Sequence, residues 1–225
     1  MIHGGPEAQL RPIWNSIAQF FAQNGYAVAA PNVRGSTGYG KRYEHLDDIE
    51  KRLDSVRDLV GLKDWLEAQD RFDTDRVVLY GGSYGGYMVL AGLAFHPEHW
   101  AAGVDIVGIS SLVTFLENTS EWRRAFSERE YGYLDRDREF LERASPMSQI
   151  DQMRAPLFII HGANDPRVPL GEAEQIHRVL TEKGIPCELA VYWDEGHGLA
   201  KLQNRLDAYP RAAAFLERVL SRTRA

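Results

Sequence analysis

Hydrophobic patterns of helical and strand type alternate along this chain. Apolar residues recur at helical spacing over 10–21, and the continuous apolar run 26–30 that follows predicts a buried strand. The same alternation predicts further helices and strands, which are helices over 53–68, 172–183 and 206–220 and strands over 76–80, 101–107, 156–161 and 186–193. Short strands that are buried on both faces and joined by helices indicate a mainly parallel sheet with helices on both sides, an α/β fold.

One turn in this pattern carries a candidate nucleophile. The motif Gly81-x-Ser83-x-Gly85 follows the apolar run 77–80 and precedes the run 88–91, which can be helical. A serine presented on a sharp strand-to-helix turn needs glycines on either side, because side chains there would collide with the strand or the helix. The motif by itself also fits a structural turn or a phosphate-binding loop.

Two later loops supply the partners that a catalytic serine needs. Asp165 follows the strand predicted over 156–161, and His197 follows the strand predicted over 186–193. Loops at the carboxyl ends of parallel strands gather at one edge of a sheet, so Ser83, Asp165 and His197 are expected to meet there. Their order along the chain, Ser, Asp, His, is that of the α/β-hydrolase fold.

The roles of these residues follow from acyl-transfer chemistry. His197 would accept the proton of Ser83 during attack on a carbonyl, and Asp165 would fix the imidazole tautomer. The oxyanion would be held by the backbone N–H of Tyr84 and by a second N–H from the loop that begins His3-Gly4-Gly5-Pro6. The alternative for this short segment is a disordered terminus.

Five stretches of sequence together resemble the catalytic domain of the prolyl oligopeptidase family of serine peptidases, with the acylaminoacyl-peptidase branch nearest. They are the His3 to Pro6 loop, residues 32–40, the elbow at 81–88, residues 161–169 and Glu195-Gly196-His197. The resemblance implies a short peptide, an acylated amino acid or a small ester as substrate, with no cofactor. It also implies that Arg167 holds a substrate carbonyl and that Gly5 is the second oxyanion donor, with Gly4 as the alternative.

The chain departs from this family at its amino terminus. Nothing before His3 could supply the β-propeller of these relatives, and only Met1 and Ile2 stand where the third strand of the hydrolase sheet should lie. We therefore expect residues 1–225 to form a single, amino-terminally truncated α/β-hydrolase domain. Three explanations for the missing strand stay open: the chain is a fragment, the neighbouring strands close up, or a second copy covers the gap as a homo-oligomer.

The stretch 119–145 is rich in charge and in aromatic residues. It could be a lid whose aromatic side chains line an acyl or side-chain pocket, or a helical excursion that packs on its own domain. The two interpretations are compatible.

Composition and the remaining residues narrow the function further. A net charge of −6 disfavours nucleic-acid and anionic-membrane partners, and the lack of a signal or a long apolar run predicts a cytoplasmic protein. Cys187 is expected to be a small core residue, and His161 a hydrogen-bonded structural one. Asp194, Glu195 and His197 lack the spacing of a zinc motif, so no metal is expected.

These observations predict a serine hydrolase that cleaves peptide or acylaminoacyl bonds through an acyl-Ser83 intermediate. A carboxylesterase acting on short acyl esters is the close alternative. The alternative of another class is a non-catalytic hydrolase-like remnant used for binding or assembly, because the sheet is incomplete.

Overall fold

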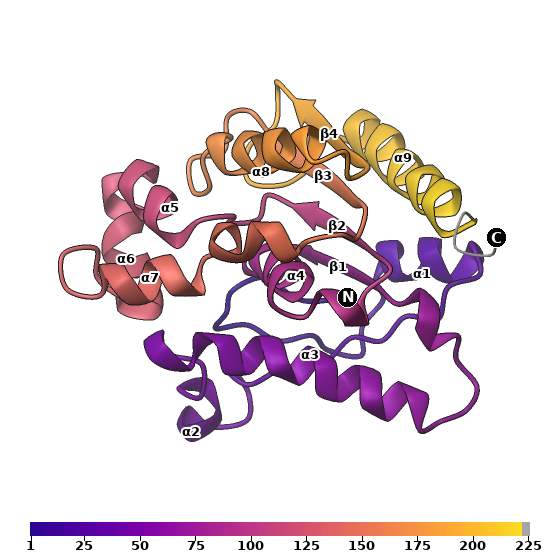
Figure 1. Cartoon of the computed structure of the whole chain (residues 1–225), viewed down its shortest axis with the longest axis horizontal. Helices are drawn as coiled ribbons and strands as arrows, with labels where there is room; N and C mark the ends of the chain where they lie inside the picture. The colour runs from indigo at the N-terminus through magenta and orange to yellow at the C-terminus, as the bar shows by residue number, and fades with distance from the viewer. Residues whose placement is uncertain (222–225) are drawn as a thin grey trace.

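A four-stranded parallel sheet forms the centre of the computed structural model, which describes residues 1–221 (Figure 1). The strands lie side by side in chain order, and they are β1 (Val78–Gly82), β2 (Ala102–Ile106), β3 (Leu157–Gly162) and β4 (Cys187–Tyr192). Each falls within two residues of a predicted strand, and the predicted parallel direction is confirmed. Their carboxyl ends therefore point to one edge of the sheet.

Helices cover both faces of this sheet, and each face has its own apolar cluster. One cluster packs three helices on the sheet: α3 (Arg52–Glu67), α4 (Tyr84–Phe95) and α8 (Gly171–Glu182). The other cluster packs α1 (Ser16–Gln23) and α9 (Leu202–Ser221) on the opposite face. Alternate strand residues divide between the clusters, as the side-chain period of a strand requires: Ile159 joins the first, and Phe158 and Ile160 the second.

Short elements connect these layers. They are the helices α2 (Lys41–Glu44), α5 (Leu112–Asn118), α6 (Glu121–Tyr131) and α7 (Arg138–Ala144), and the 3₁₀ turns η1 (Ile49–Lys51), η2 (Thr74–Arg76), η3 (Pro97–His99) and η4 (Pro146–Gln152). The helix predicted over 10–21 begins only at Ser16. The Asn15 side chain accepts hydrogen bonds from the N–H groups of Ile17 and Ala18, both at 3.0 Å, and so caps the helix there.

The predicted strand over 26–30 is wrong. These residues belong to no strand of the sheet, and most of them are exposed. Their apolar composition matches a buried strand, but a strand needs a neighbour with which to form ladder hydrogen bonds. Among residues 1–221, only Met1 and Ile2 occupy the position between this segment and β1.

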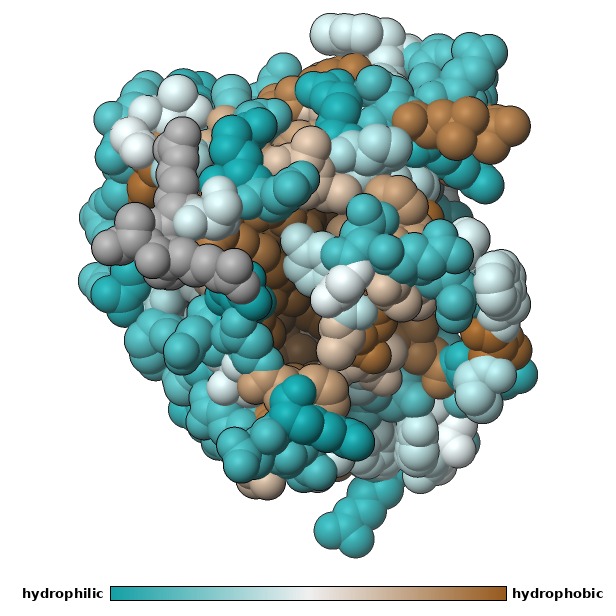
Figure 2. Space-filling view, turned by 90° about the vertical axis from the view of Figure 1, so that its right-hand side faces the viewer, coloured by the Kyte–Doolittle hydropathy of each residue, from teal (hydrophilic) through white to brown (hydrophobic). Residues whose placement is uncertain are grey.

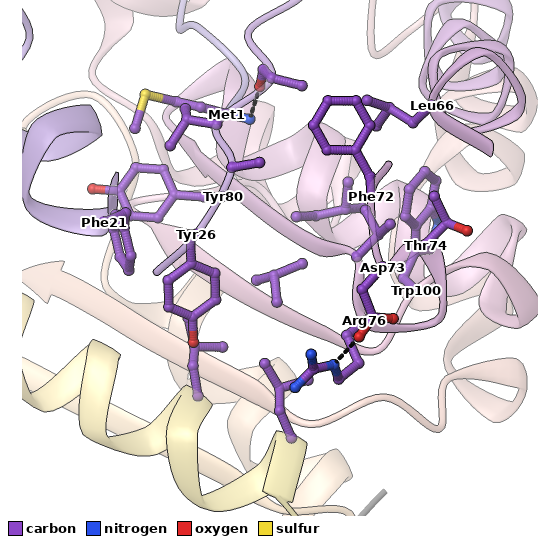
Figure 3. A pocket seen from close by; sticks show the side chains of 18 of the residues that line it. Met1, Phe21, Tyr26, Leu66, Phe72, Asp73, Thr74, Arg76, Tyr80 and Trp100 are labelled. Atoms are coloured by element: carbon purple, nitrogen blue, oxygen red, sulfur yellow. Dashed lines mark hydrogen bonds and ion pairs between the residues drawn. The ribbon is translucent and has the colours of Figure 1, made fainter. Parts of the chain in front are cut away.

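Those two residues pair as the beginning of a strand. Ile2 forms a parallel bridge with Gly81, and its N–H donates to the carbonyl of Tyr80 at 2.7 Å. Beyond Met1 the space between β1 and residues 26–31 is a cavity of about 1260 Å³, visible as an apolar hollow in Figure 2. Figure 3 shows this cavity from close by, with Met1 at one end and Tyr80 on one side. The neighbouring segments have therefore not closed up, and that explanation for the missing strand is wrong.

The stretch 119–145 is helical, and its aromatic residues divide into two groups. Tyr131 and Phe140 are buried in the first apolar cluster, whereas Trp122 and Phe126 on α6 are 58% and 64% exposed. The buried pair fits a packed excursion, and the exposed pair leaves an aromatic surface. Both predicted interpretations therefore keep some support.

No helix within residues 1–221 combines the length and the apolar character needed to cross a membrane.

Candidate active site

Ser83 lies at the junction of β1 and α4, where the backbone is strained. Its φ of 58° and ψ of −118° place it in a region that non-glycine residues rarely adopt. A Cβ on Gly81 would lie 2.3 Å from the carbonyl oxygen of Gly85, so the turn tolerates only glycine at position 81. The strand, turn and helix predicted for a nucleophile elbow are confirmed.

Three predicted residues meet at this turn. The His197 Nε2 lies 2.9 Å from the Ser83 Oγ, and its Nδ1 lies 2.7 Å from the Asp165 Oδ2. Ser83 follows β1, Asp165 follows β3 and His197 follows β4, so the common sheet edge brings together residues distant in sequence. The result is a continuous hydrogen-bonded chain from carboxylate to imidazole to hydroxyl.

The surroundings of Asp165 keep its carboxyl group ionised. The side chain is fully buried, and burial raises the pKa of a carboxyl group. This effect is outweighed by the hydrogen bond to His197 and by the backbone N–H groups of Arg167 and Val168, which donate to Oδ1 at 2.8 and 3.0 Å. The net result is a pKa of Asp165 below its ordinary value, so the group is a negative partner for the imidazole ring.

Tyr84 begins α4, and its side chain is anchored away from the serine. Its hydroxyl lies 2.8 Å from the Ser55 Oγ and donates to the Asp47 Oδ2 at 3.0 Å, and its ring stacks with Tyr87. Within residues 1–221 no side chain caps the first turn of α4, so no side-chain oxygen of that range accepts from the N–H groups at this helix end. These groups, and the positive end of the helix dipole, suit a developing oxyanion.

The loop over residues 3–6 packs against the elbow. A Cβ on Gly4 would lie 3.5 Å from the Ser83 Cβ and 3.2 Å from the carbonyl oxygen of Gly82. The buried His3 ring is hydrogen-bonded through Nε2 to the Ser36 Oγ at 2.8 Å, and burial lowers its pKa. The segment is held in place, contrary to the alternative of a disordered terminus. The choice between Gly5, whose φ is 137°, and Gly4 as oxyanion donor stays a prediction.

Arg167 is exposed, two residues after Asp165. Its carbonyl oxygen accepts a hydrogen bond from the Thr119 Oγ1 at 2.6 Å, and the Ser120 Oγ donates to the carbonyl of Pro166 at 3.0 Å. Residues 1–221 offer its guanidinium no ion-pair partner within 4 Å. The alternative of a surface ion pair therefore has no support within that range. The two hydrogen bonds place the start of α6 next to the loop that carries Asp165.

Two buried glutamates support the site and were not singled out for this role from the sequence. Glu195 accepts hydrogen bonds from the N–H groups of Ala200 and Lys201 at 3.0 and 2.8 Å, which tie the His197 loop to the approach to α9. Glu172 accepts from the N–H groups of Ser110 and Ser111 at 3.0 and 2.8 Å, in the loop that follows β2. The sequence shows two acidic residues, but it does not identify the backbone N–H groups that each one binds.

One cluster of carboxylates could bind a metal ion, but it is already paired with an arginine. Asp47, Asp48 and Glu130 place carboxylate oxygens within 4.8 Å of one another, but Arg52 pairs with Asp47 and, at 2.7 Å, with Glu130. This guanidinium supplies the positive charge that a cation would otherwise bring. We assign no metal to the cluster.

Two further predictions concern structural residues. The His161 Nε2 lies 3.0 Å from the carbonyl of Val168, so His161 is the hydrogen-bonded residue expected from the sequence. Cys187 begins β4, and burial raises the pKa of its thiol to about 12, which suits an unreactive packing residue.

Comparisons with known proteins agree with this geometry. Residues 13–223 match the family described as "Prolyl oligopeptidase family". Dipeptidyl aminopeptidase BIII of Pseudoxanthomonas mexicana is 38% identical over 209 residues, which is 91% of this chain and 30% of that protein. The acylamino-acid-releasing enzyme of Rattus norvegicus is 25% identical over 96% of this chain and 30% of its own length.

Solved structures show the same fold. A puromycin-hydrolysing peptidase of Mycobacterium tuberculosis superposes with a TM-score of 0.90 at 28% identity, over 97% of this chain and 33% of that one. The acylaminoacyl peptidase of Pyrococcus horikoshii gives a TM-score of 0.88 at 26% identity, over 96% and 36%. The predicted α/β-hydrolase fold is confirmed, and the chain spans about 30% of the length of the curated relatives it matches.

Proposed function

Because the chain belongs to the prolyl oligopeptidase family, we propose that it is a serine hydrolase that cleaves peptide or acylaminoacyl bonds through an acyl-Ser83 intermediate. The observation that carries this proposal is the hydrogen-bonded chain from Asp165 through His197 to Ser83, with contacts of 2.7 and 2.9 Å. A nucleophile and a base within hydrogen-bond reach, with a third group that orients the base, are what acyl transfer requires.

In the first step Ser83 attacks the substrate carbonyl while its proton passes to the His197 Nε2. The negative charge that develops on the carbonyl oxygen is held by the Tyr84 N–H and by an N–H of the His3 to Pro6 loop. The imidazolium then gives its proton to the leaving amine, and the acyl group stays on Ser83. Water, deprotonated by the same ring, releases the acid and restores the hydroxyl.

The substrate class follows from the family rather than from the triad, which cleaves any sufficiently reactive acyl bond. The matched proteins carry names for dipeptidyl aminopeptidase, acylamino-acid-releasing and puromycin-hydrolysing activities. In this protein Arg167 would bind a carbonyl group of the substrate. The exposed aromatic surface of Trp122 and Phe126 is available to a substrate side chain.

Two measurements test the proposal. The chain should be labelled by a fluorophosphonate probe, and Ser83→Ala should abolish labelling while preserving the fold. Turnover of aminoacyl anilides and of p-nitrophenyl esters should fall together in this variant. Undiminished turnover of both substrates by Ser83→Ala would refute the mechanism, and a folded chain that does not label would favour a non-catalytic remnant.

The ratio of the two turnover rates separates peptidase from esterase. Amide cleavage needs more protonation of the leaving group by His197 than cleavage of an activated ester does. We propose that anilides with a blocked or short aminoacyl group are cleaved. Ester turnover alone would favour the carboxylesterase.

A further inference from the structure

A buried arginine connects the elements around the elbow. Arg52, the first residue of α3, is fully buried. Its Nη1 donates to the Asp47 Oδ2, and its Nη2 donates to the Glu130 Oε1 at 2.7 Å and to the Glu130 carbonyl oxygen at 2.8 Å. One guanidinium therefore ties the segment before α3 to the last turn of α6.

The same guanidinium packs on two aromatic rings. Its Cζ lies 5.1 Å from the centroid of the Tyr84 ring and 4.8 Å from that of the Tyr131 ring, and the two centroids are 6.5 Å apart. A cation over the face of an aromatic ring is attracted to it, and more strongly where water is excluded. Since Tyr84 begins α4 and Tyr131 ends α6, Arg52 holds these two helix ends together.

The side chain of Tyr84 is fixed along its whole length. Arg52 and Tyr87 contact its ring. Its hydroxyl donates to the Asp47 Oδ2 at 3.0 Å and lies 2.8 Å from the Ser55 Oγ. All five residues are buried, so the ring cannot change rotamer without breaking contacts that water does not replace.

This anchorage acts on the backbone next to the nucleophile. Ser83 has a φ of 58°, and a conformation of this kind persists only where the surrounding structure holds it. Tyr84 follows directly, and its N–H is the first oxyanion donor of the proposed mechanism. A ring that cannot move fixes the direction of this N–H. Donors fixed in advance stabilise a developing charge best, because they need no rearrangement during the reaction.

The other end of α6 is tied to the loop of the catalytic acid. Just before the helix begins, the Thr119 Oγ1 donates to the carbonyl of Arg167 at 2.6 Å, and the Ser120 Oγ donates to the carbonyl of Pro166 at 3.0 Å. The helix therefore runs from the acid side of the site to the oxyanion side, with its exposed aromatic residues between. Through the buried guanidinium, the position of α6 is linked to that of the oxyanion donor.

We propose that Arg52 is a positioning residue of the oxyanion site, which holds the Tyr84 N–H in place and links it to α6. This role rests on the acyl transfer proposed above for Ser83. A lysine would keep the charge but not the role, because an ammonium group lacks the planar fork that bonds Asp47 and Glu130 and stacks on the two rings. Arg52 touches no substrate and acts through Tyr84.

Two variants test this role, one on each side of the contact. Arg52→Lys removes the planar fork, and Tyr84→Phe removes the hydroxyl contacts while it keeps the ring and the backbone N–H. Loss of an oxyanion donor lowers kcat about 100- to 1000-fold, so displacement of one should lower it about tenfold or more. The KM for an aminoacyl anilide should change by less than about twofold, because the donor acts mainly in the transition state.

Affinity for a boronic acid gives a readout that a loss of stability alone does not move. In an aminoacyl boronic acid the Ser83 oxygen adds to boron while its proton passes to His197, and the tetrahedral adduct mimics the transition state. The inhibition constant should rise in both variants by the same factor by which kcat/KM falls.

Tyr192→Phe is the matched control for the loss of a tyrosine hydroxyl. The Tyr192 hydroxyl donates to the Asp207 Oδ2 at 2.6 Å, between β4 and α9. This variant should lower the Tm and keep the kcat and the boronate affinity of the parent. All assays are made well below the Tm of each variant, so that only folded protein is compared.

The outcomes separate this role from the mechanism on which it rests. A parent that neither turns over the anilide nor binds the boronic acid would refute acyl transfer at Ser83, and this role with it. An active parent whose two variants lower the Tm but keep its kcat and boronate affinity would overturn the role of Arg52 alone. Tyr84→Phe decides the matter if Arg52→Lys does not fold, because it leaves the ion pairs of Arg52 in place.

Discussion

A methyl group on Gly85 would lie 2.4 Å from the carbonyl oxygen of Ile2. The first turn of α4 and the amino-terminal segment are thus in direct backbone contact beneath the elbow. This contact fixes the position at which the His3 to Pro6 loop begins. Gly4 of that loop in turn packs against Ser83. The elbow and the proposed second oxyanion donor are therefore positioned by one close approach of two backbones.

Gly85→Ala should disrupt this contact. Because the neighbour is backbone rather than a flexible side chain, the methyl group forces the two segments apart, and we expect a loss of about 1–3 kcal/mol of stability. Turnover should fall more than stability alone explains, since Ser83 and the loop move apart. Urea unfolding and kcat with an aminoacyl anilide measure the two effects.

Gly61→Ala is the matched control for that variant. Gly61 lies inside α3, and a Cβ there would meet nothing within 4 Å. The substitution should stabilise the protein by about 0.5–1 kcal/mol, because alanine favours a helix interior. Equal effects of the two substitutions would contradict the argument from close packing.

Asp165→Asn should remove the group that fixes the imidazole tautomer. The amide can present its NH₂ group to the His197 Nδ1, which leaves Nε2 protonated and unable to accept from Ser83. We expect kcat to fall by about 10⁴-fold with little change in KM, as such a substitution does in a serine protease triad. Asp194→Asn, on the surface near the same loop, should keep most of the activity. A loss below tenfold at Asp165 would argue against its role.

The three residues of the triad could be predicted from the sequence because each stands at a position that a local pattern marks. Ser83, Asp165 and His197 each follow an apolar strand, and parallel topology alone brings such loops to one edge. The prediction for 26–30 is wrong because an apolar run indicates only that the side chains can be buried. A strand also needs a neighbouring strand, and between β1 and this segment the described residues supply only Met1 and Ile2. No local pattern carries that information.

The supporting glutamates show the same limit. Glu172 contacts a loop about sixty residues away in sequence, so its partners exist only after folding. Glu195 lies near its partners in sequence, but no local pattern shows that its carboxylate accepts from the N–H groups of Ala200 and Lys201. Burial and hydrogen bonding give Glu195 this role, and both are properties of the folded chain.

Glu195→Ala should loosen the loop that carries His197. The substitution leaves the N–H groups of Ala200 and Lys201 without their acceptor, and we expect a cost of about 1–3 kcal/mol for the loss of hydrogen bonds to a charged group. We expect a lower Tm and a lower kcat, with KM nearly unchanged. Asp194→Ala, whose side chain is exposed, is the control and should alter neither quantity by much. A stable but inactive Glu195→Ala variant would instead indicate a direct part in the reaction.

Arg167→Gln should weaken substrate binding rather than the chemical step. A charged hydrogen bond to a carbonyl group contributes about 1.5–3 kcal/mol, so KM for a peptide anilide should rise roughly tenfold or more. Fluorophosphonate labelling, which needs no peptide carbonyl, should continue at nearly the rate of the parent. Arg178→Gln, exposed on α8, is the matched control. Loss of labelling in Arg167→Gln would show that the residue supports the triad instead.

Asp105 should make stability depend on pH. It lies on β2 beneath the elbow, fully buried, and its carboxyl oxygens lack a well-oriented hydrogen-bond partner among the described residues. Burial raises its pKa to about 8, although the nearby Gly108 N–H lowers it in part. Between about pH 4 and pH 8 the folded state thus holds a proton that the unfolded state releases, so stability falls as the pH rises through this window.

Asp105→Asn removes that titration while preserving shape. The variant and the parent should be similar in stability near pH 4. At pH 8 to 9 the variant should be more stable by roughly 1–3 kcal/mol, because folding of the parent then requires either a buried charge or the uptake of a proton at a free-energy cost. Urea unfolding at several pH values measures this difference. Asp75→Asn, at an exposed position in η2, should give a difference independent of pH. A constant offset for Asp105→Asn would mean that this carboxyl group is ionised in the folded protein throughout the range.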